Sequence, residues 1–228
     1  MNASLLSGLT DIPVIQSGEL WTATWQTLAM TAISSVLTVI GGIILGLVLV
    51  GTGKGGLFPN RAVNQILGTI VNIGRSFPFV ILVVAIIPFT RMVAGTSIGW
   101  KAAIVPLTVG AIPFFARLVE SNLLGIESGK IEAAKMMGAS RRQIMFDVQI
   151  REALPALIQS ITVTVITLIG YSAITGMLGG DGLGFLAVSY GYNRFETDVM
   201  ILAVLVVIVI VEVIQLIGDM LSRLVDHR

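Results

Sequence analysis

The stretch KIEAAKMMGASRRQ, residues 130–143, is a short charged segment between two long apolar stretches. Gly138 is suited to end a helix, because glycine readily adopts the left-handed cap conformation. Ser140 followed by Gln143 is a capping-box pattern, which starts a second helix leading into the next apolar stretch. The segment is therefore predicted to be a helix, a glycine break and another helix.

Ser128 is expected to cap the first of these helices, with Glu132 in its first turn near the positive end of the helix dipole. Such a rigid segment could transmit the movement of a partner protein, whereas a flexible loop could not. The alternative is an amphipathic connector at the membrane surface that has no partner.

The composition predicts a protein with several membrane spans. The 228-residue chain is 55% hydrophobic and 12% charged, with 25 glycines and no cysteine, whereas a soluble domain has about 25% charged residues. Without cysteine there is no disulfide framework. The net charge of +1 gives no indication of nucleic-acid binding, and one histidine, His227, cannot build a zinc site or a catalytic triad.

Apolar stretches long enough for a membrane helix predict five spans. Residues 1–20 carry no Lys or Arg, which is unlike a signal peptide, and they are expected to form an outer segment before a transmembrane domain of 21–228. No internal repeat is visible. The second span is interrupted by Arg75, Pro78 and Pro88, and the spans are expected at about 21–50, within 62–90, and at about 101–123, 154–178 and 198–220.

The distribution of Lys and Arg predicts the orientation. With the N-terminus outside and the C-terminus in the cytoplasm, the inner segments hold ten of these residues, the outer segments hold three, and Arg75 lies near the membrane. The loop 124–153 then faces the cytoplasm. Trp and Tyr residues that favour the membrane interface fall on the outer side in this arrangement: Trp21, Trp25, Trp100, Tyr190 and Tyr192.

The fourth expected span carries a stripe of hydroxyl groups. At 100° per residue, seven residues fall within an arc of about 100°: Ser160, Thr164, Thr167, Tyr171, Ile174, Thr175 and Leu178. The hydroxyls could bond to their own helix or to a neighbouring helix. Alternatively, the stripe lines a transiently wet pathway, with Tyr171 and Ile174 as candidates for its constriction.

Arg75 is costly at mid-bilayer, by roughly 2.5–3.5 kcal/mol. It could lie near the inner interface and extend toward water, or it could pair with Glu212 inside the bundle. Glu212, Gln215 and Asp219 share one face of the last span, which is expected to contact protein rather than lipid.

The chain is not expected to bind a nucleotide itself. GTGKGG (51–56) fails the P-loop pattern, which requires G-x-x-x-x-G-K-[ST], and is read as a turn. GGDGLG (179–184) lacks the strand and helix of a dinucleotide site and is expected to form a tight external turn. An intramembrane enzyme is disfavoured.

The segment EAAKMMGA (132–139) resembles the EAA loop of ABC importer permeases. In that family Glu-Ala-Ala is followed by Gly six residues after the Glu, then by an aliphatic residue ten positions after the Gly, then by Leu-Pro. Val148 and Ile150 take the aliphatic and Leu places, but Arg151 stands at the Pro place, which puts a local bend there in doubt. The matching residues of the motif are Glu132, Ala133, Ala134 and Gly138, next to Ala139.

Further segments resemble the methionine importer permeases, which are five-span members of the same family. These are GRSFPF (74–79), residues 95–120, GYSAITGMLGGDGLG (170–184) and YGYNRFETDVM (190–200). The resemblance covers most of the chain after about residue 20.

The resemblance implies an all-α type I importer domain in the bacterial inner membrane, with a cytoplasmic coupling helix formed by Glu132, Ala133, Ala134, Gly138 and Ala139. It implies two such permeases, a homodimeric ATPase that binds ATP and Mg, and an external methionine-binding lipoprotein, with no cofactor on this chain. The span that carries Thr167, Tyr171, Ile174, Thr175 and Leu178 would border the pathway.

Three alternatives stay open on the sequence. The chain could serve another small amino acid or organic solute. It could be an ion-coupled carrier, although such carriers usually have repeats and a buried carboxylate pair. It could also be a membrane anchor or assembly factor without a pathway.

Overall fold

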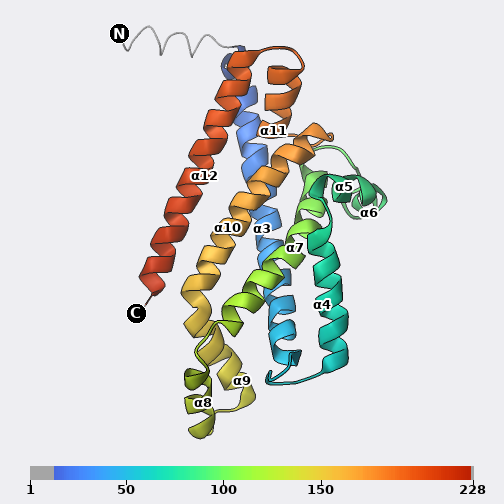
Figure 1. The fold of residues 1–228 in the computed structure, drawn as a ribbon. Helices are drawn as coiled ribbons and strands as arrows, with labels where there is room; N and C mark the ends of the chain where they lie inside the picture. Colours follow the sequence, from blue (N-terminus) through green and yellow to red (C-terminus); the bar gives the residue numbers. More distant parts are fainter. Residues whose placement is uncertain (1–12, 227–228) are drawn as a thin grey trace. The chain divides into compact units, whose positions relative to one another are not determined.

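The computed structural model describes residues 13–226, and in this range the chain is helical and contains no strand (Figure 1). Four helices in this range are individually long and apolar enough to cross a membrane: α3 (Glu19–Thr52), α7 (Trp100–Leu124), the continuous helix Arg141–Met177 and α12 (Thr197–Val225). A fifth span is counted if the bent pair α4 (Arg61–Ser76) and α5 (Phe79–Ala85) forms one crossing. The all-α class with about five spans is therefore confirmed.

The second span is broken at Pro78, as the sequence predicted. α4 begins after Asn60, whose Oδ1 accepts the backbone N–H of Val63 at 3.2 Å. α4 ends at Ser76 and α5 begins at Phe79. Proline has no N–H to continue the ladder of α4, and the Pro78 carbonyl instead accepts the N–H groups of Ile81 and Leu82, each at 3.0 Å, to start α5.

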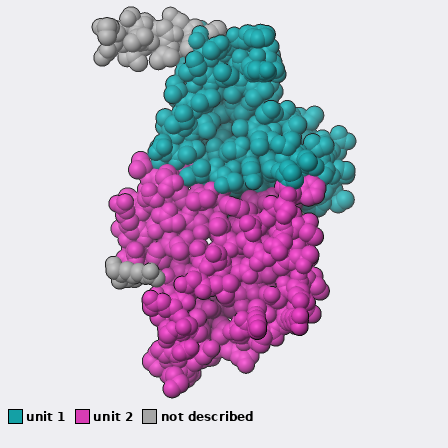
Figure 2. Space-filling model, in the orientation of Figure 1, with its two compact units in different colours: residues 1–35, 78–108, 165–213 teal, residues 36–77, 109–164, 214–228 magenta. Residues whose placement is uncertain are grey.

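The chain forms two compact units, coloured separately in Figure 2, and each unit is assembled from three stretches of sequence. Unit 1 comprises residues 1–35, 78–108 and 165–213, and unit 2 comprises residues 36–77, 109–164 and 214–228. The boundary expected at residue 20 stays a prediction. His227 lies outside the described residues.

Unit 1 has an apolar core where the start of α3 and the start of α12 meet the segment between α10 and α12. This segment contains α11 (Leu183–Phe185) and the π-helical η2 (Leu186–Tyr192). α2 (Pro13–Gln16) packs beside them, and α6 (Ile87–Ala94) ends at Gly95 with φ 75°. The buried core residues are Val14, Leu20, Ala23, Leu183, Leu186, Val199 and Ala203.

The segment GGDGLG forms the tight turn that the sequence predicted. Gly179 and Gly182 have φ of 99° and 94°, a region that favours glycine. Asp181 accepts the backbone N–H of Trp100 at 3.1 Å, and the N–H of Gly182 donates to Gln26 Oε1 at 3.1 Å. These bonds tie the turn to α3 and α7 within unit 1.

Unit 2 is built around the close approach of α3 and α7. Gly42 and Gly46 form a G-x-x-x-G pattern on α3, which lets helix backbones approach each other in membranes. A Cβ at Gly46 would lie 2.6 Å from Val119 of α7, so no larger residue fits. The remaining elements of this part of the chain are α8 (Ser128–Met136), α9 (Arg141–Gln143), the π-helical η1 (Ile144–Ile150) and α10 (Arg151–Met177), and the core consists of Val50, Phe115, Val119, Leu123, Ala153 and Leu157.

Candidate functional site

The EAA segment has the helix–glycine–helix architecture predicted from the sequence. α8 ends in a Schellman motif in which Gly138, with φ 81°, donates to Lys135 O at 3.0 Å and Ala139 donates to Ala134 O at 3.0 Å. The capping box is also present: Gln143 N–H donates to Ser140 Oγ at 3.3 Å, and Ser140 N–H donates to Gln143 Oε1 at 2.9 Å.

The expected start of α8 was wrong by one residue. Ser128 is the first helical residue and Glu127 occupies the cap position, without a side-chain cap bond. The helix starts early because the N–H of Lys130 already bonds to the carbonyl of Glu127, at 3.1 Å. Glu132 therefore lies beyond the first turn and does not take the N-terminal dipole position expected for it.

One side of this segment is fixed to its own unit. Lys130 forms an ion pair with Glu152 of α10, and Ala134 is only 4% exposed. The guanidinium carbon of Arg141 lies 5.7 Å from the ring centroid of Phe58. η1 adds three buried side chains, those of Ile144, Met145 and Gln149.

The opposite side of α8 is uncovered. Glu132, Ala133 and Gly138 are exposed, and Met136 and Met137 are 90% and 82% exposed. Of the five predicted coupling residues, Ala134 therefore faces its own chain and Ala139 is half-buried. Sequence reasoning missed the two methionines, whose signal was an apolar pair inside a charged segment. Methionine is flexible and polarizable, which suits adaptable contacts.

The hydroxyl stripe of α10 is largely bonded within the protein. Thr164 donates to Ser160 O at 2.7 Å, and Thr175 donates to Ser172 O at 2.8 Å. Ser160 Oγ accepts the amide of Asn122 at 2.8 Å. At Ser160, Thr164 and Thr175 the structure therefore has the packing arrangement that the sequence left open as an alternative.

The other predicted pathway residues have varied surroundings in unit 1. The ring of Tyr171 stacks on Phe79, with centroids 4.1 Å apart and planes 5° apart. Thr167 and Ile174 are half-buried, and Leu178 is 41% exposed. Aromatic stacking of this kind fixes the position of Tyr171 on α10 relative to α5.

Thr175 and Leu178 also line a cavity of about 160 Å³ in unit 1. Its other walls come from α5, α6, α7, the segment between α6 and α7, and Gly180, and they are mainly apolar. Thr90 lines it too; this side chain is 5% exposed, and its hydroxyl has no hydrogen-bond partner in the described part of the chain. A buried hydroxyl without a partner is costly. A small molecule in this cavity could form the hydrogen bond that the Thr90 hydroxyl lacks.

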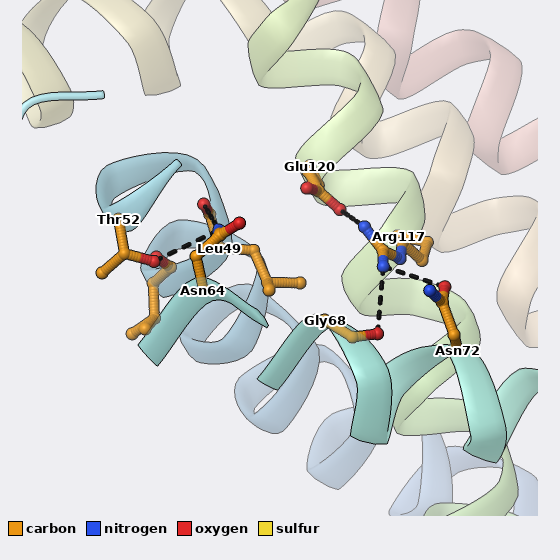
Figure 3. A network of polar contacts seen from close by, with 8 residues as sticks. Leu49, Thr52, Asn64, Gly68, Asn72, Arg117 and Glu120 are labelled. Atoms are coloured by element: carbon orange, nitrogen blue, oxygen red, sulfur yellow. Dashed lines mark hydrogen bonds and ion pairs between the residues drawn. The ribbon is translucent and has the colours of Figure 1, made fainter. Parts of the chain in front are cut away.

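α4 is fastened to its neighbours by the polar network of Figure 3. Asn64 Nδ2 donates to Leu49 O at 2.8 Å and to Thr52 Oγ1 at 3.3 Å, at the end of α3. Arg117 of α7 forms an ion pair with Glu120 and donates to Gly68 O at 3.2 Å.

Arg75, in the last turn of α4, is exposed and has no ion pair in the described part of its unit. Glu212 belongs to the other unit. On the last span, Asp219 accepts hydrogen bonds from Gln215 at 2.9 Å and from Gln159 of α10 at 3.1 Å. The expected protein contact of that face is thus confirmed at Asp219.

The fold and the EAA segment together define an integral membrane permease of the type I importer class. Residues 39–228 match the family of the binding-protein-dependent transport system inner membrane component. The chain belongs to this family, and it is therefore a transport permease subunit of the inner membrane.

Similar proteins place the chain among the methionine permeases of that family. It is 52% identical to a probable D-methionine transport system permease protein MetI of Vibrio cholerae, over 94% of this chain and 95% of the relative. It is 47% identical to the methionine import system permease protein MetP of Bacillus subtilis, over 95% and 97%.

Solved structures agree with this assignment. An inward-facing MetNI methionine ABC transporter matches with a TM-score of 0.91 and 44% identity, covering 95% of this chain and 100% of that one. An amino acid ABC transporter matches with a TM-score of 0.77 at 17% identity, which supports the fold alone.

Proposed function

We propose that this chain is the permease subunit of an ATP-driven methionine importer, working as two copies with a homodimeric ATPase and an external methionine-binding lipoprotein. ATP and Mg are bound by the ATPase. The N-terminus is outside, the C-terminus is cytoplasmic, and the loop 124–153, which contains the EAA segment, faces the cytoplasm. The high identity to methionine permeases over nearly the whole chain supports the substrate, and the Lys and Arg distribution supports the orientation.

The observation that carries this proposal is the two-sided character of α8. One side is anchored to its own unit by an ion pair and buried residues, whereas Met136 and Met137 project uncovered from the opposite side. In the proposed complex the ATPase covers this exposed side, at Glu132, Ala133, Met136, Met137 and Gly138. Ala134 and Ala139 support the contact indirectly, because they shape the helix end.

A movement of α8 is passed into the permease through α9 and η1, which continue directly into α10. α10 carries the proposed pathway residues Thr167, Tyr171, Ile174, Thr175 and Leu178. Coupling then requires that the two states of the permease differ in their affinity for the ATP-bound ATPase and for the loaded binding protein.

The first experiment tests the docking side of α8. In a Met136→Ser, Met137→Ser double variant, we expect the copurified ATPase and the stimulated ATP hydrolysis to fall at least several-fold. The matched control is Met92→Ser on α6, because Met92 is also 82% exposed. Full complex and full stimulation in the double variant would refute the proposed docking side.

A second experiment uses the backbone at Gly138. Gly138→Val should disrupt the end of α8, because φ of 81° is unfavourable for a β-branched residue, whereas Gly138→Asn should retain the Schellman motif. We expect ATPase binding to fail in the first variant and to persist in the second. Equal binding by both would show that the motif is not needed.

The substrate is tested by uptake of labelled methionine into liposomes that contain the complete transporter. Competition by other unlabelled amino acids separates a methionine importer from one for another small solute. Uptake that persists when the partner ATPase is disabled would indicate an ion-coupled carrier and would overturn the ATP-driven mechanism.

A further inference from the structure

α4 has three distinct faces, and one of them is packed against the rest of the chain. At 100° per residue the centres of these faces are about 120° apart. The packed face is formed by Asn64, Leu67, Gly68, Val71 and Gly74. The apolar face is formed by Val63, Ile66, Ile70 and Ile73. The polar face is formed by Gln65, Thr69, Asn72 and Ser76.

The packed face runs alongside α3 and α7 in unit 2. Asn64 bonds to the end of α3, Gly68 accepts a bond from Arg117 of α7, and a Cβ at Gly74 would lie 2.7 Å from Pro113 Cγ. These contacts extend over almost three turns of α4, next to helices long enough to cross the membrane. α4 therefore lies along these spanning helices rather than flat across their ends.

The apolar face is exposed along its whole length. Ile66, Ile70 and Ile73 are 62%, 57% and 60% exposed. At membrane depth such a face is compatible with lipid chains, because burial in hydrocarbon costs these side chains nothing.

The polar face is exposed as well, along the same length of α4. Gln65 and Thr69 make no side-chain hydrogen bond within the described residues, whereas Asn72 Oδ1 accepts from Arg117 at 2.8 Å and Ser76 donates to Asn72 O at 2.9 Å. Transfer of an amide or hydroxyl into hydrocarbon without a partner costs roughly 4–8 kcal/mol on a cyclohexane scale. This face must therefore meet water or other polar groups.

A hollow of about 480 Å³ adjoins the polar face through the contact between Arg117 and Asn72. It is lined by Arg75, Arg117, Glu120 and Ser121 together with three apolar residues. Arg117 forms an ion pair with Glu120, and Arg75 is a second arginine in the lining. The hollow therefore carries an excess of positive charge that suits a carboxylate-bearing solute.

We propose that the polar face of α4 and this basic hollow line the water-filled, cytoplasmic half of the translocation pathway, where a hydrated zwitterionic amino acid passes. This inference rests on the proposed function. The alternative is a second copy packed directly on the polar face, because Gln, Asn, Ser and Thr side chains can also hydrogen-bond between membrane helices. The charged hollow beside this face favours the water-filled pathway.

The chain contains no cysteine, so single cysteines can be introduced without background. Thr69, Ile70 and Val71 are consecutive and lie on the polar, apolar and packed faces. Each would be replaced by cysteine in the complete transporter, in inside-out membrane vesicles, and treated with a charged methanethiosulfonate or with a lipid-soluble maleimide. Gln65, Ile66 and Leu67 repeat the same three faces one turn earlier.

We expect the charged reagent to label the polar-face variants Thr69→Cys and Gln65→Cys about tenfold faster than the apolar-face variants, because a charge is costly in hydrocarbon. The lipid-soluble reagent should label the apolar-face variants Ile70→Cys and Ile66→Cys. The packed-face variant Val71→Cys, which replaces a side chain that is 1% exposed, should resist both reagents until denaturation.

Two results would overturn the proposal. The first is labelling of both polar-face variants by the lipid-soluble reagent alone. The second is protection of their new thiols together with efficient disulfide cross-linking between two copies, which would make the polar face a subunit contact. Labelling requires no substrate. If methionine uptake fails but the labelling pattern is as expected, methionine is refuted as the substrate, whereas the proposal that the polar face lines the pathway is not.

Discussion

α4 and the first half of α10 both carry polar stripes at helical spacing, but the two stripes have different surroundings. On α10, Ser160 and Thr164 are buried and hydrogen-bonded. On α4, Gln65 and Thr69 are exposed and unbonded within the described residues. Helical spacing therefore shows that side chains share a face, but it does not show whether that face meets protein, lipid or water.

The chemistry of the side chains explains part of this difference. A threonine hydroxyl can bond to a carbonyl of its own helix and can then be buried at little cost. A glutamine amide has two donors and an acceptor on a long side chain, and it is difficult to satisfy in this way. Amides in a membrane helix are thus a better sequence signal for a wet face than hydroxyls.

The largest effect is expected on the packed face of α4, since both of its exposed faces depend on it. Gly74→Leu would place the new Cβ 2.7 Å from Cγ of Pro113, and a proline ring cannot easily move aside. Overpacking costs about 1–3 kcal/mol, and we expect little folded protein by size-exclusion chromatography. Gly170→Leu is the control, because nothing lies within 4 Å of a Cβ there. Equal yields would show that this contact does not hold α4.

A smaller loss is expected when Arg117 is replaced. Arg117→Leu removes the bonds to Gly68 and Asn72 and leaves Glu120 without its ion-pair partner. Hydrogen bonds to charged groups contribute about 1.5–3 kcal/mol, so we expect a lower melting temperature and reduced uptake. Arg117→Lys keeps the charge but not the fork geometry, and it should give an intermediate melting temperature. A melting temperature unchanged in Arg117→Leu would exclude a role in fixing α4.

The polar face itself should affect transport without affecting assembly. In a Gln65→Leu, Thr69→Val double variant we expect uptake to fall about fivefold, equivalent to a barrier increase of about 1 kcal/mol, because the wall becomes apolar. The amount of complex should stay constant, since both side chains are exposed and neither forms a hydrogen bond within the described residues. The matched control is Ile66→Leu on the apolar face. Normal uptake in the double variant would argue against a wet wall at α4.

The sequence predicted the EAA segment well because its signals are local. Gly138 and the pair Ser140 and Gln143 each determine the backbone around them, and the structure contains the expected cap at both places. The burial of Ala134 could not be predicted in this way, because it depends on how the segment packs against the rest of its unit. The same applies to α4, whose wet face becomes visible only once α3 and α7 occupy another face.

The smallest effect is expected on the bonded stripe of α10. Thr164→Val keeps the shape of the side chain and removes a hydroxyl that bonds only to the carbonyl of Ser160 in its own helix. Even hydrogen bonds between membrane helices contribute only about 0.6 kcal/mol on average, so uptake and melting temperature should stay near the wild-type values. Uptake reduced as strongly as in the α4 double variant would mean that Thr164 meets the pathway in another state of the transporter. The difference between the two stripes would then be a property of this one conformation, and it would not distinguish two kinds of helix face.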